Sequence, residues 1–489
     1  MSEARTFGEF AASLRGARIH VAGLAGTECS AFLRALSRHG VTGAIVHDLS
    51  PDREALARTF STTHVALPPD EREALLVQLL AEVEDLRLGD RYLEGIEEAD
   101  VLFVSQAWDL YPRNAPVAAF LASSPERVLT LMDLMLRFLP CPVIGVTGTN
   151  GKTTTASMLV ALLEAAEVAV ATGGNHRYHD QLLPGIDAIS KDAVAVLEVS
   201  HKHLARLARG PAVAVVTNVT GDHLDQLPRH EYEARKARLV EVQHPGDLSV
   251  LCADDPVCRR LAAQAPGRVA LFSVHGDPAP EADAAWLRGA NLVVRVGGDQ
   301  VVVPRAAVQQ PGLHSVANAL GAMLAVSPWV RDARTLGRGL RAFRGVRHRL
   351  EYLRRIGGIP VWDDSASTSP AATLAAVEAL VEEGAAQVVL VAGGDDKGND
   401  WSAVARVGGR VRALALLPGT AADRLAETLP NVPATRHVNL REALDAALLA
   451  AQPGDALLVS PAGAGFFARF AEGDGDAPGL RAMIRRWGR

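Results

Sequence analysis

Short apolar runs alternate with longer amphipathic stretches along most of the chain. The apolar run at 18–22 precedes a glycine turn, a helical stretch and a second apolar run at 43–48. Another apolar run follows at 99–105, and helical spacing over 125–139 leads into a Pro-Cys-Pro segment. This order predicts strands joined by helices in a first block, with a boundary at the prolines.

The middle of the chain continues the alternation with runs rich in valine, alanine and leucine. Such continuous runs, separated by helical stretches, predict a parallel sheet that is covered on both faces. Two further runs, 292–296 and 300–303, flank Gly297-Gly298-Asp299 and predict a β-hairpin. The other strands of this second block are expected at 142–146, 193–199, 212–218, 248–253 and 269–273.

A third block begins near residue 345, and it again alternates strands with helices. The chain of 489 residues has room for about three domains of ~150 residues each. We therefore predict an α/β protein with domains at 1–139, 140–344 and 345–489. Strands of the third block are expected at 360–362, 387–392, 412–417 and 456–459, and helices are expected to start near Ala371, Trp401, Ala421 and Leu440.

Composition narrows the class of protein. The formal net charge is −6 and the 50 Lys and Arg are spread along the chain, so no nucleic-acid partner is expected. The N-terminus lacks the features of a signal peptide, and no apolar run is long enough for a membrane span. The four cysteines form no CxxC pair. A cytoplasmic monomer that acts on small molecules, away from membranes, is expected.

The segment 143–155 carries the most specific chemistry. A β-type run enters a turn with Gly148 and Gly151, and Lys152 and Thr153 follow at the start of a helical pattern. This is the layout of a phosphate-binding loop, although Val146 stands where the strict motif has its first glycine. An ordinary glycine-rich turn is the alternative, and the Lys-Thr-Thr at the helix start disfavours it.

Two candidate metal ligands follow predicted strands of the same block. Glu198 ends one strand and His223 comes just after another, and open α/β sheets place ligands at such ends. Either side chain alone is more simply a solvated polar group, but together with Lys152 and Thr153 they indicate a metal site. In the first block, Asp48 follows a strand, a glycine turn, a helix and a second strand, and it could contact a ribose. A plain βαβ unit without a nucleotide is the alternative, because the glycine spacing is not G-x-G-x-x-G.

Motifs in the second and third blocks resemble those of the Mur ligases and occur in the same order along the chain. The Mur ligases are ATP-dependent amide ligases of peptidoglycan precursor synthesis. Gly173-Gly174-Asn175 and 394–397 are most similar to the MurD type, which adds glutamate to UDP-N-acetylmuramoyl-L-alanine. The segments that carry the resemblance are 147–154, 197–200, 218–225, 234–238, 312–320, 345–351, 363–365 and 393–397.

The resemblance implies a three-domain fold with a Rossmann-like donor domain, a central P-loop ATPase domain and a Rossmann-like amino-acid domain. It implies that ATP activates a carboxylate as an acyl phosphate, which an amine then attacks. Catalytic roles fall to Lys152, His223 and Lys236. The implied ATP contacts are Gly148, Thr149, Asn150, Gly151, Lys152, Thr153, Thr154, Asn318, Arg349 and Asp364.

The resemblance also implies two Mg²⁺ ions and a lysine that CO₂ converts into a carbamate. Thr153, Glu198, His223 and the carbamate of Lys236 would hold the metals. The implied substrates are a UDP-linked carboxylate donor and an amino-acid acceptor, and the implied contacts to them are Thr27, Asn175, Thr368 and Lys397.

Several positions near the implied substrates depart from the family pattern. Ala366 and Gly465 replace polar residues on the amino-acid side, and His176-Arg177 follows Asn175 in place of Ile-Gly. In the first block Ser105-Gln106 replaces Ser-Pro, and no arginine follows Asp48. Three hypotheses stay open: a glutamate-adding ligase, a homologue that joins another acid and amine in specialised metabolism, and a nucleotide-binding protein without catalysis.

Overall fold

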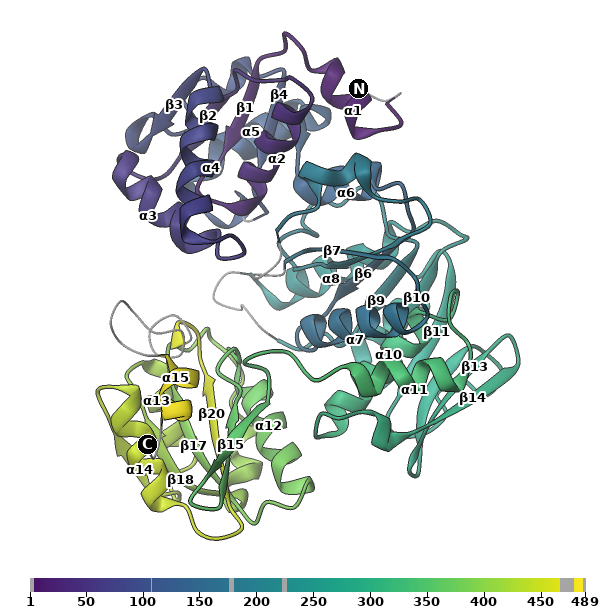
Figure 1. Ribbon diagram of the computed structural model, residues 1–489, viewed down its shortest axis with the longest axis vertical. Helices are drawn as coiled ribbons and strands as arrows, with labels where there is room; N and C mark the ends of the chain where they lie inside the picture. Colours follow the sequence, from purple (N-terminus) through teal and green to yellow (C-terminus); the bar gives the residue numbers. More distant parts are fainter. Residues whose placement is uncertain (1–3, 107, 176–179, 222–226, 467–478, 487–489) are drawn as a thin grey trace.

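The structure is a computed structural model that describes residues 4–106, 108–175, 180–221, 227–466 and 479–486. Within these residues the strands form three sheets, which follow one another along the chain. The strand orders are β3-β2-β1-β4-β5, then β14-β13-β12-β11-β10-β9-β6-β8-β7, then β15-β16-β20-β17-β18-β19. Figure 1 shows the three sheets one below another, with helices packed against each. The predicted α/β class is confirmed, and the predicted domain limits stay a proposal.

The first sheet is parallel, and its strands other than the edge strand β3 are buried. Strand β1 (Ile19–Ala22) lies between β2 (Ile45–Asp48) and β4 (Val101–Val104), and all of its residues are buried. Burial on both faces explains why β4 is a continuous apolar run, whereas β1 and β2 also carry buried polar residues. The remaining elements are α1 Phe7–Ser13, α2 Thr27–Arg38, α3 Arg53–Thr63, α4 Pro69–Glu82, β3 Asp85–Leu88, α5 Ala115–Ser123, β5 Val128–Leu129 and α6 Leu131–Phe138.

The prediction of one helix over 125–139 was wrong. A 3₁₀ turn at Pro125–Arg127 leads into the short strand β5, and only then does α6 begin. Thr130 ends the strand segment because its hydroxyl accepts the N–H of Asp133 as the helix cap. The apolar pair at β5 pairs with β4 and is buried there, so tertiary packing outweighs the local helical spacing.

The second sheet is parallel except at one edge, where β12 pairs antiparallel with β13 and β13 pairs antiparallel with β14. Strand β6 (Val143–Thr147) lies between β8 (Val194–Glu198) and β9 (Val213–Val216). The predicted hairpin is confirmed, since Val296 pairs with Asp299 across Gly297-Gly298. The other elements are β7 Val170–Gly174, β10 Leu248–Cys252, β11 Arg268–Ser273, β12 Ala284–Arg288, β13 Asn291–Val296, β14 Asp299–Pro304, α7 Lys152–Ala165, α8 Arg229–Glu241, α9 Pro256–Ala262, α10 Leu313–Ala325 and α11 Ala333–Ala342.

In the third sheet, β15 (Glu351–Ile356) runs antiparallel to β16 (Ile359–Asp363), and the other pairs are parallel. The helix expected from Trp401 is a 3₁₀ segment at Val404–Arg410, where Gly408-Gly409 weakens an α-helix. The remaining elements are α12 Pro370–Glu382, β17 Val388–Gly393, β18 Val411–Leu416, α13 Thr420–Thr428, β19 Ala434–Arg436, α14 Leu440–Ala450, β20 Ala456–Ala462 and α15 Leu480–Arg486.

One apolar cluster joins the first two sheets, whereas the third sheet has clusters of its own. Phe10 and Phe138 bring α1 and α6 together with ring centroids 5.2 Å apart. None of the described helices is both long and apolar enough to cross a bilayer. The first two blocks therefore pack as neighbours, and the third is attached through the segment before β15.

Two buried histidines face each other on β1 and β2. Nδ1 of His20 lies 2.9 Å from Nε2 of His47, and their rings are stacked. Burial lowers the pKa of His20 to about 4 and that of His47 to about 3. Both imidazoles are therefore neutral in the fold at neutral pH.

We predict that this pair makes the stability of the fold depend on pH. Unfolded histidines titrate near 6.5, so the unfolded chain binds more protons than the fold once the pH falls below that value. Stability should decline from pH ~6.5 toward pH ~4, by a few kcal/mol in total. Thermal midpoints should show this decline in the wild type and a flatter profile in the double variant His20→Gln, His47→Gln. The exposed His230→Gln should keep the wild-type slope.

Candidate functional site

The turn between β6 and α7 leaves no room for side chains at its two glycines. Gly148 and Gly151 have φ of 148° and 84°. A Cβ on Gly148 would lie 1.9 Å from Oγ1 of Thr217, and one on Gly151 would lie 2.4 Å from Oδ1 of Asn318. No described side chain caps α7, so the N–H groups of its first turn are available to an anion. The turn therefore fits a phosphate group.

The end of β9 holds this turn in place. The hydroxyl of Thr217 donates to the carbonyl of Asn150 at 2.6 Å, and the N–H of Asn150 donates to Oδ1 of Asn218 at 3.0 Å. The N–H of Thr149 donates to the carbonyl of Asn218 at 2.9 Å. The sequence did not indicate a role for Thr217. Its hydroxyl lies where a side chain on Gly148 would be, and only the fold brings these two residues together.

Lys152, the first residue of α7, folds back over the turn. Its Nζ donates to the carbonyls of Gly148 at 2.9 Å and Thr149 at 2.8 Å. These carbonyls hold the ammonium directly above the loop, where it can reach a bound phosphate. Thr154 follows in the first turn of α7 and lines the cavity that opens above the loop, which is described below.

A carboxylate, a hydroxyl and an amide meet beside Lys152. The hydroxyl of Thr153 donates to Oε2 of Glu198 at 2.7 Å, and Nδ2 of Asn175 donates to Oε1 of Glu198 at 3.0 Å. Glu198 is buried at the end of β8. A hydroxyl and a carboxylate in contact are the hard oxygen ligands that Mg²⁺ prefers, so these residues fit the predicted ion. His223, the other predicted ligand, lies outside the described residues.

Lys236 lies under the turn, on α8, with 1% of its surface exposed. Its Nζ donates to the carbonyl of Gly148 at 2.9 Å and to Oγ1 of Thr147 at 3.1 Å. The ring of Tyr232 lies 5.4 Å from the same nitrogen. The structure therefore places Lys236 against the turn, and its conversion into a carbamate stays a prediction.

A cavity of about 630 Å³ opens above the turn, between the second and third sheets. Asn318 enters it from α10, and Arg349 and Asp364 line it from the third block. These three predicted nucleotide contacts come from separate segments, yet all face the cavity that the turn closes. Other predicted residues that line it are Thr149, Asn150, Gly151, Lys152, Thr153, Thr154, Asn175, Glu198 and Thr368.

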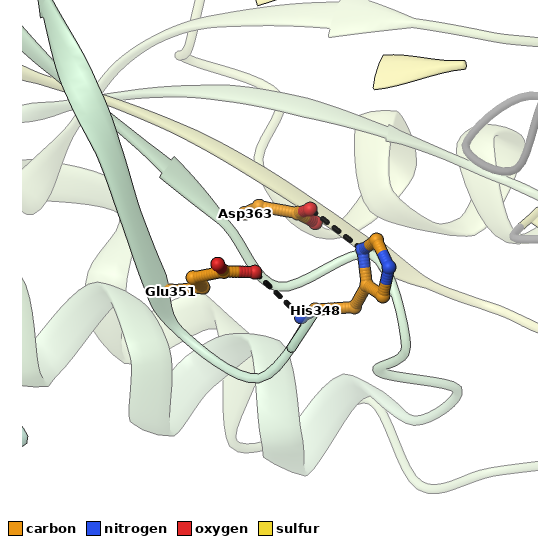
Figure 2. A group of neighbouring side chains, drawn as sticks. All are labelled: His348, Glu351 and Asp363. Atoms are coloured by element: carbon orange, nitrogen blue, oxygen red, sulfur yellow. Dashed lines mark hydrogen bonds and ion pairs between the residues drawn. The ribbon is translucent and has the colours of Figure 1, made fainter. Parts of the chain in front are cut away.

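Three polar side chains fix the bend that carries Arg349 (Figure 2). Nδ1 of His348 lies 2.7 Å from Oδ2 of Asp363, and the N–H of His348 donates to Oε2 of Glu351 at 3.1 Å. The nitrogen and oxygen atoms of His348, Glu351 and Asp363 that could bind a metal ion lie within 4.8 Å of one another. Glu351 also accepts a hydrogen bond from Arg481, so its carboxylate already has a cationic partner. His348 and Leu350 adopt φ of 63° and 44°, a backbone conformation that these contacts stabilise.

Asp364 is buried beside this bend. It accepts the hydroxyls of Ser367 at 2.6 Å and Ser460 at 2.8 Å, and the N–H of Leu350 at 3.1 Å. Burial raises the pKa of Asp364 to about 6, against the opposing effects of these hydrogen bonds and of Arg349. This carboxyl group is therefore tied both to the bend and to β20.

The predicted substrate residues lie in different places. Nζ of Lys397 donates to Oγ1 of Thr368 at 3.3 Å, and Thr368 lines the cavity. Thr27 is half-buried at the start of α2 in the first block, and its substrate role stays a prediction. The oxygens of Asp48 accept the N–H groups of Ala25 at 2.8 Å and Ser50 at 2.9 Å, and the ribose contact considered for this residue stays a prediction.

A buried polar network joins the first block to the second, and the sequence reasoning missed it. Oε1 of Glu28 lies 2.8 Å from Nε2 of His203, and Oε2 accepts the N–H of Gln106 at 2.7 Å. The hydroxyl of Ser200 donates to Oε1 of Gln106 at 2.8 Å and lies 3.2 Å from Nδ1 of His203. The network closes the first block onto the segment that follows Glu198.

Comparison with known proteins assigns the chain to a family. Residues 146–326 match the Mur ligase middle domain, and residues 348–463 match the Mur ligase, glutamate ligase domain. A UDP-N-acetylmuramoylalanine–D-glutamate ligase of Symbiobacterium thermophilum is 36% identical over 77% of this chain and 82% of its own length. The ligase of that name in Pelotomaculum thermopropionicum is 34% identical over 81% of this chain and 85% of its own length.

Solved structures agree with this assignment at the level of the fold. The UDP-N-acetylmuramate-alanine ligase of Thermotoga maritima superposes with a TM-score of 0.55, covering 91% of this chain and 96% of its own at 18% identity. MurF of Acinetobacter baumannii gives a TM-score of 0.56, with 87% and 89% covered at 16% identity. The chain belongs to the Mur ligase family.

We predict that Lys152→Ala abolishes ligation without unfolding the protein. The side chain of Lys152 is not part of the core. Loss of its positive charge beside the phosphoryl group that is transferred should lower the rate by about 10²- to 10³-fold. Phosphate release measures the rate, and circular dichroism monitors the fold. Lys191→Ala, at an exposed lysine, is the matched control and should keep wild-type turnover. Near wild-type turnover of Lys152→Ala would contradict the phosphate-binding assignment.

Proposed function

We propose that this Mur ligase forms an amide bond between glutamate and the carboxylate of UDP-N-acetylmuramoyl-L-alanine, with hydrolysis of ATP to ADP, in the synthesis of peptidoglycan precursors. The relatives named UDP-N-acetylmuramoylalanine–D-glutamate ligase support both the donor and the acceptor. The observation that carries the proposal is the cavity, in which Lys152, Glu198 and Arg349 converge from two sheets.

The chemistry follows from the poor reactivity of a carboxylate toward amines. The donor carboxylate oxygen bonds to the terminal phosphorus of ATP and ADP leaves, which gives an acyl phosphate. The acceptor amine then bonds to the acyl carbon, loses its proton, and phosphate leaves. Phosphoryl transfer depends on position and charge neutralisation, which is what Lys152 and the oxygen pair of Thr153 and Glu198 can supply.

We assign the remaining roles on the same basis. Two Mg²⁺ ions would neutralise phosphate charge when bound, with Thr153 and Glu198 at one ion. His223 and a carbamate on Lys236 would serve the other. The enzyme would act in the cytoplasm as a monomer, on small molecules, without a membrane or nucleic-acid partner.

A specific observation favours a second candidate, a ligase with a different donor in specialised metabolism. Glu28 lies in the first turn of α2, where the helix dipole would otherwise favour an anionic phosphate. Its carboxylate is engaged by His203 and by the N–H of Gln106. The start of α2 is thus already supplied with a negative charge, which disfavours a diphosphate there.

A matrix of phosphate-release assays distinguishes the two candidates. Donors are UDP-N-acetylmuramoyl-L-alanine and simple N-acyl amino acids, and acceptors are D-glutamate, L-glutamate and other amino acids. The proposed function requires exclusive, efficient use of the UDP donor with D-glutamate. Turnover with another pair, and none with the UDP donor, would establish the second candidate. Absence of turnover with every pair would point to a nucleotide-binding protein without catalysis.

We predict that Lys236→Ala is nearly inactive and that formate or acetate at high concentration partly restores it. The small carboxylate would occupy the place of the missing carbamate oxygens beside the metal. Phosphate release with increasing formate is the measurement, and chloride at equal ionic strength is the control. Full activity of Lys236→Ala would refute the role, and an inactive variant without rescue would argue for a structural role beneath the turn.

A further inference from the structure

Two aspartates, Asp254 and Asp255, follow β10 and line the cavity above the turn. Strand β10 lies between β9 and β11 in the second sheet. Oδ2 of Asp254 accepts the N–H of Val274, just after β11, at 2.9 Å. Oδ2 of Asp255 accepts the N–H of Val219, shortly after β9, at 3.0 Å. The two carboxylates therefore tie the ends of both neighbouring strands to the end of β10.

Asp255 joins two elements through its two oxygens. Oδ1 caps α9 by accepting the N–H groups of Val257 and Cys258, both at 2.9 Å, while Oδ2 accepts the N–H of Val219. A helix cap needs a single oxygen, which serine, threonine and asparagine also provide. Among these capping side chains only aspartate offers two acceptor oxygens and no donor. The link to Val219 therefore explains why this position carries an aspartate.

Val219 lies between two residues that hold the turn between β6 and α7. The N–H of Thr149 donates to the carbonyl of Asn218 at 2.9 Å. The hydroxyl of Thr149 donates to the carbonyl of Thr220 at 2.9 Å and accepts the N–H of Thr220 at 3.0 Å. The position of Val219 therefore determines how Asn218 and Thr220 meet the turn.

The charge of Asp255 makes the link to Val219 a strong one. Asp255 is 8% exposed, and within the described residues no cation forms an ion pair with it. The three N–H groups of Val219, Val257 and Cys258 are what compensates this buried carboxylate. A hydrogen bond to an ionised acceptor is stronger than one between neutral groups, and a buried charge that loses a partner is costly.

We propose that Asp255 is a positioning residue for the binding of ATP with Mg²⁺. Through Val219 it holds Asn218 and Thr220 against the turn. The turn thus keeps the shape in which its N–H groups and the ammonium of Lys152 bind phosphate. The inference rests on the part of the proposed function that places ATP at the turn, and it does not depend on which donor or acceptor the enzyme uses.

The test breaks the link to Val219 and keeps the helix cap. Asp255→Asn can leave its oxygen on α9, but its amide group then meets the N–H of Val219 donor to donor. Asp255→Ser caps α9 and has no second oxygen. The matched controls are Asp332→Asn and Asp332→Ser, because the exposed Asp332 caps α11 through one hydrogen bond, from the N–H of Thr335 at 2.8 Å.

The dissociation constant of ATP with Mg²⁺ is measured from the rise of the thermal midpoint with nucleotide concentration, in the full chain without donor or acceptor. Circular dichroism confirms that each variant is folded. The expected result is about 10-fold weaker ATP binding in both Asp255 variants, because each loses one hydrogen bond to a charged group. The Asp332 variants should bind ATP within about twofold of the wild type, since surface substitutions have small effects.

A double-mutant cycle with Thr149→Val separates positioning from a direct contact with the nucleotide. Thr149→Val removes the hydroxyl that contacts Thr220, so it should weaken ATP binding much less in Asp255→Asn than in the wild type. Additive effects of the two substitutions, or unchanged ATP binding in Asp255→Asn and Asp255→Ser, would overturn the inference. A wild-type protein that ATP does not stabilise would instead reject the ATP site itself, and the role of Asp255 with it.

Discussion

The structure is organised around the lack of space at one turn. Gly148 and Gly151 approach Thr217 and Asn318 so closely that neither tolerates a Cβ. The turn must therefore form against the end of β9 and the side of α10 at once. Lys236 donates to the same turn from below. Four segments that are distant in sequence thus depend on one backbone path, and the cavity above it is a consequence of that packing.

The same constraint explains how separate sheets build one site. The oxygen pair of Thr153 and Glu198 lies at the carboxyl edge of the second sheet, because β6 and β8 are parallel neighbours. Arg349 reaches this edge from the third block only because the His348 bend is held by Asp363 and Glu351. The position of Arg349, which is a predicted ATP contact, thus depends on a bend that is held by hydrogen bonds.

Much of the second block could be predicted from the sequence because its signals are local. Apolar runs located β6, β8 and β9, and the Gly-Lys-Thr order located the start of α7. Features that depend on distant partners were not accessible in this way. The strand β5 and the 3₁₀ segment after Trp401 read as helices, since nothing local records what they pack against.

The buried networks show the same limit for the site. Glu28, Gln106 and His203 are unremarkable as single letters, and only the fold brings them together with Ser200. They join the first block to the second, whereas the turn, Glu198 and Asn318 line the cavity and match the motifs of the family resemblance.

Phosphoryl transfer requires charges at fixed positions around the phosphate groups, so the residues that supply them depend on one another. Substrate recognition requires only that each buried charge finds a partner, and different sets of residues meet that condition. Substitutions at a junction of this kind are therefore coupled: an acid such as Glu28 is tolerated only because His203 and the N–H of Gln106 satisfy it.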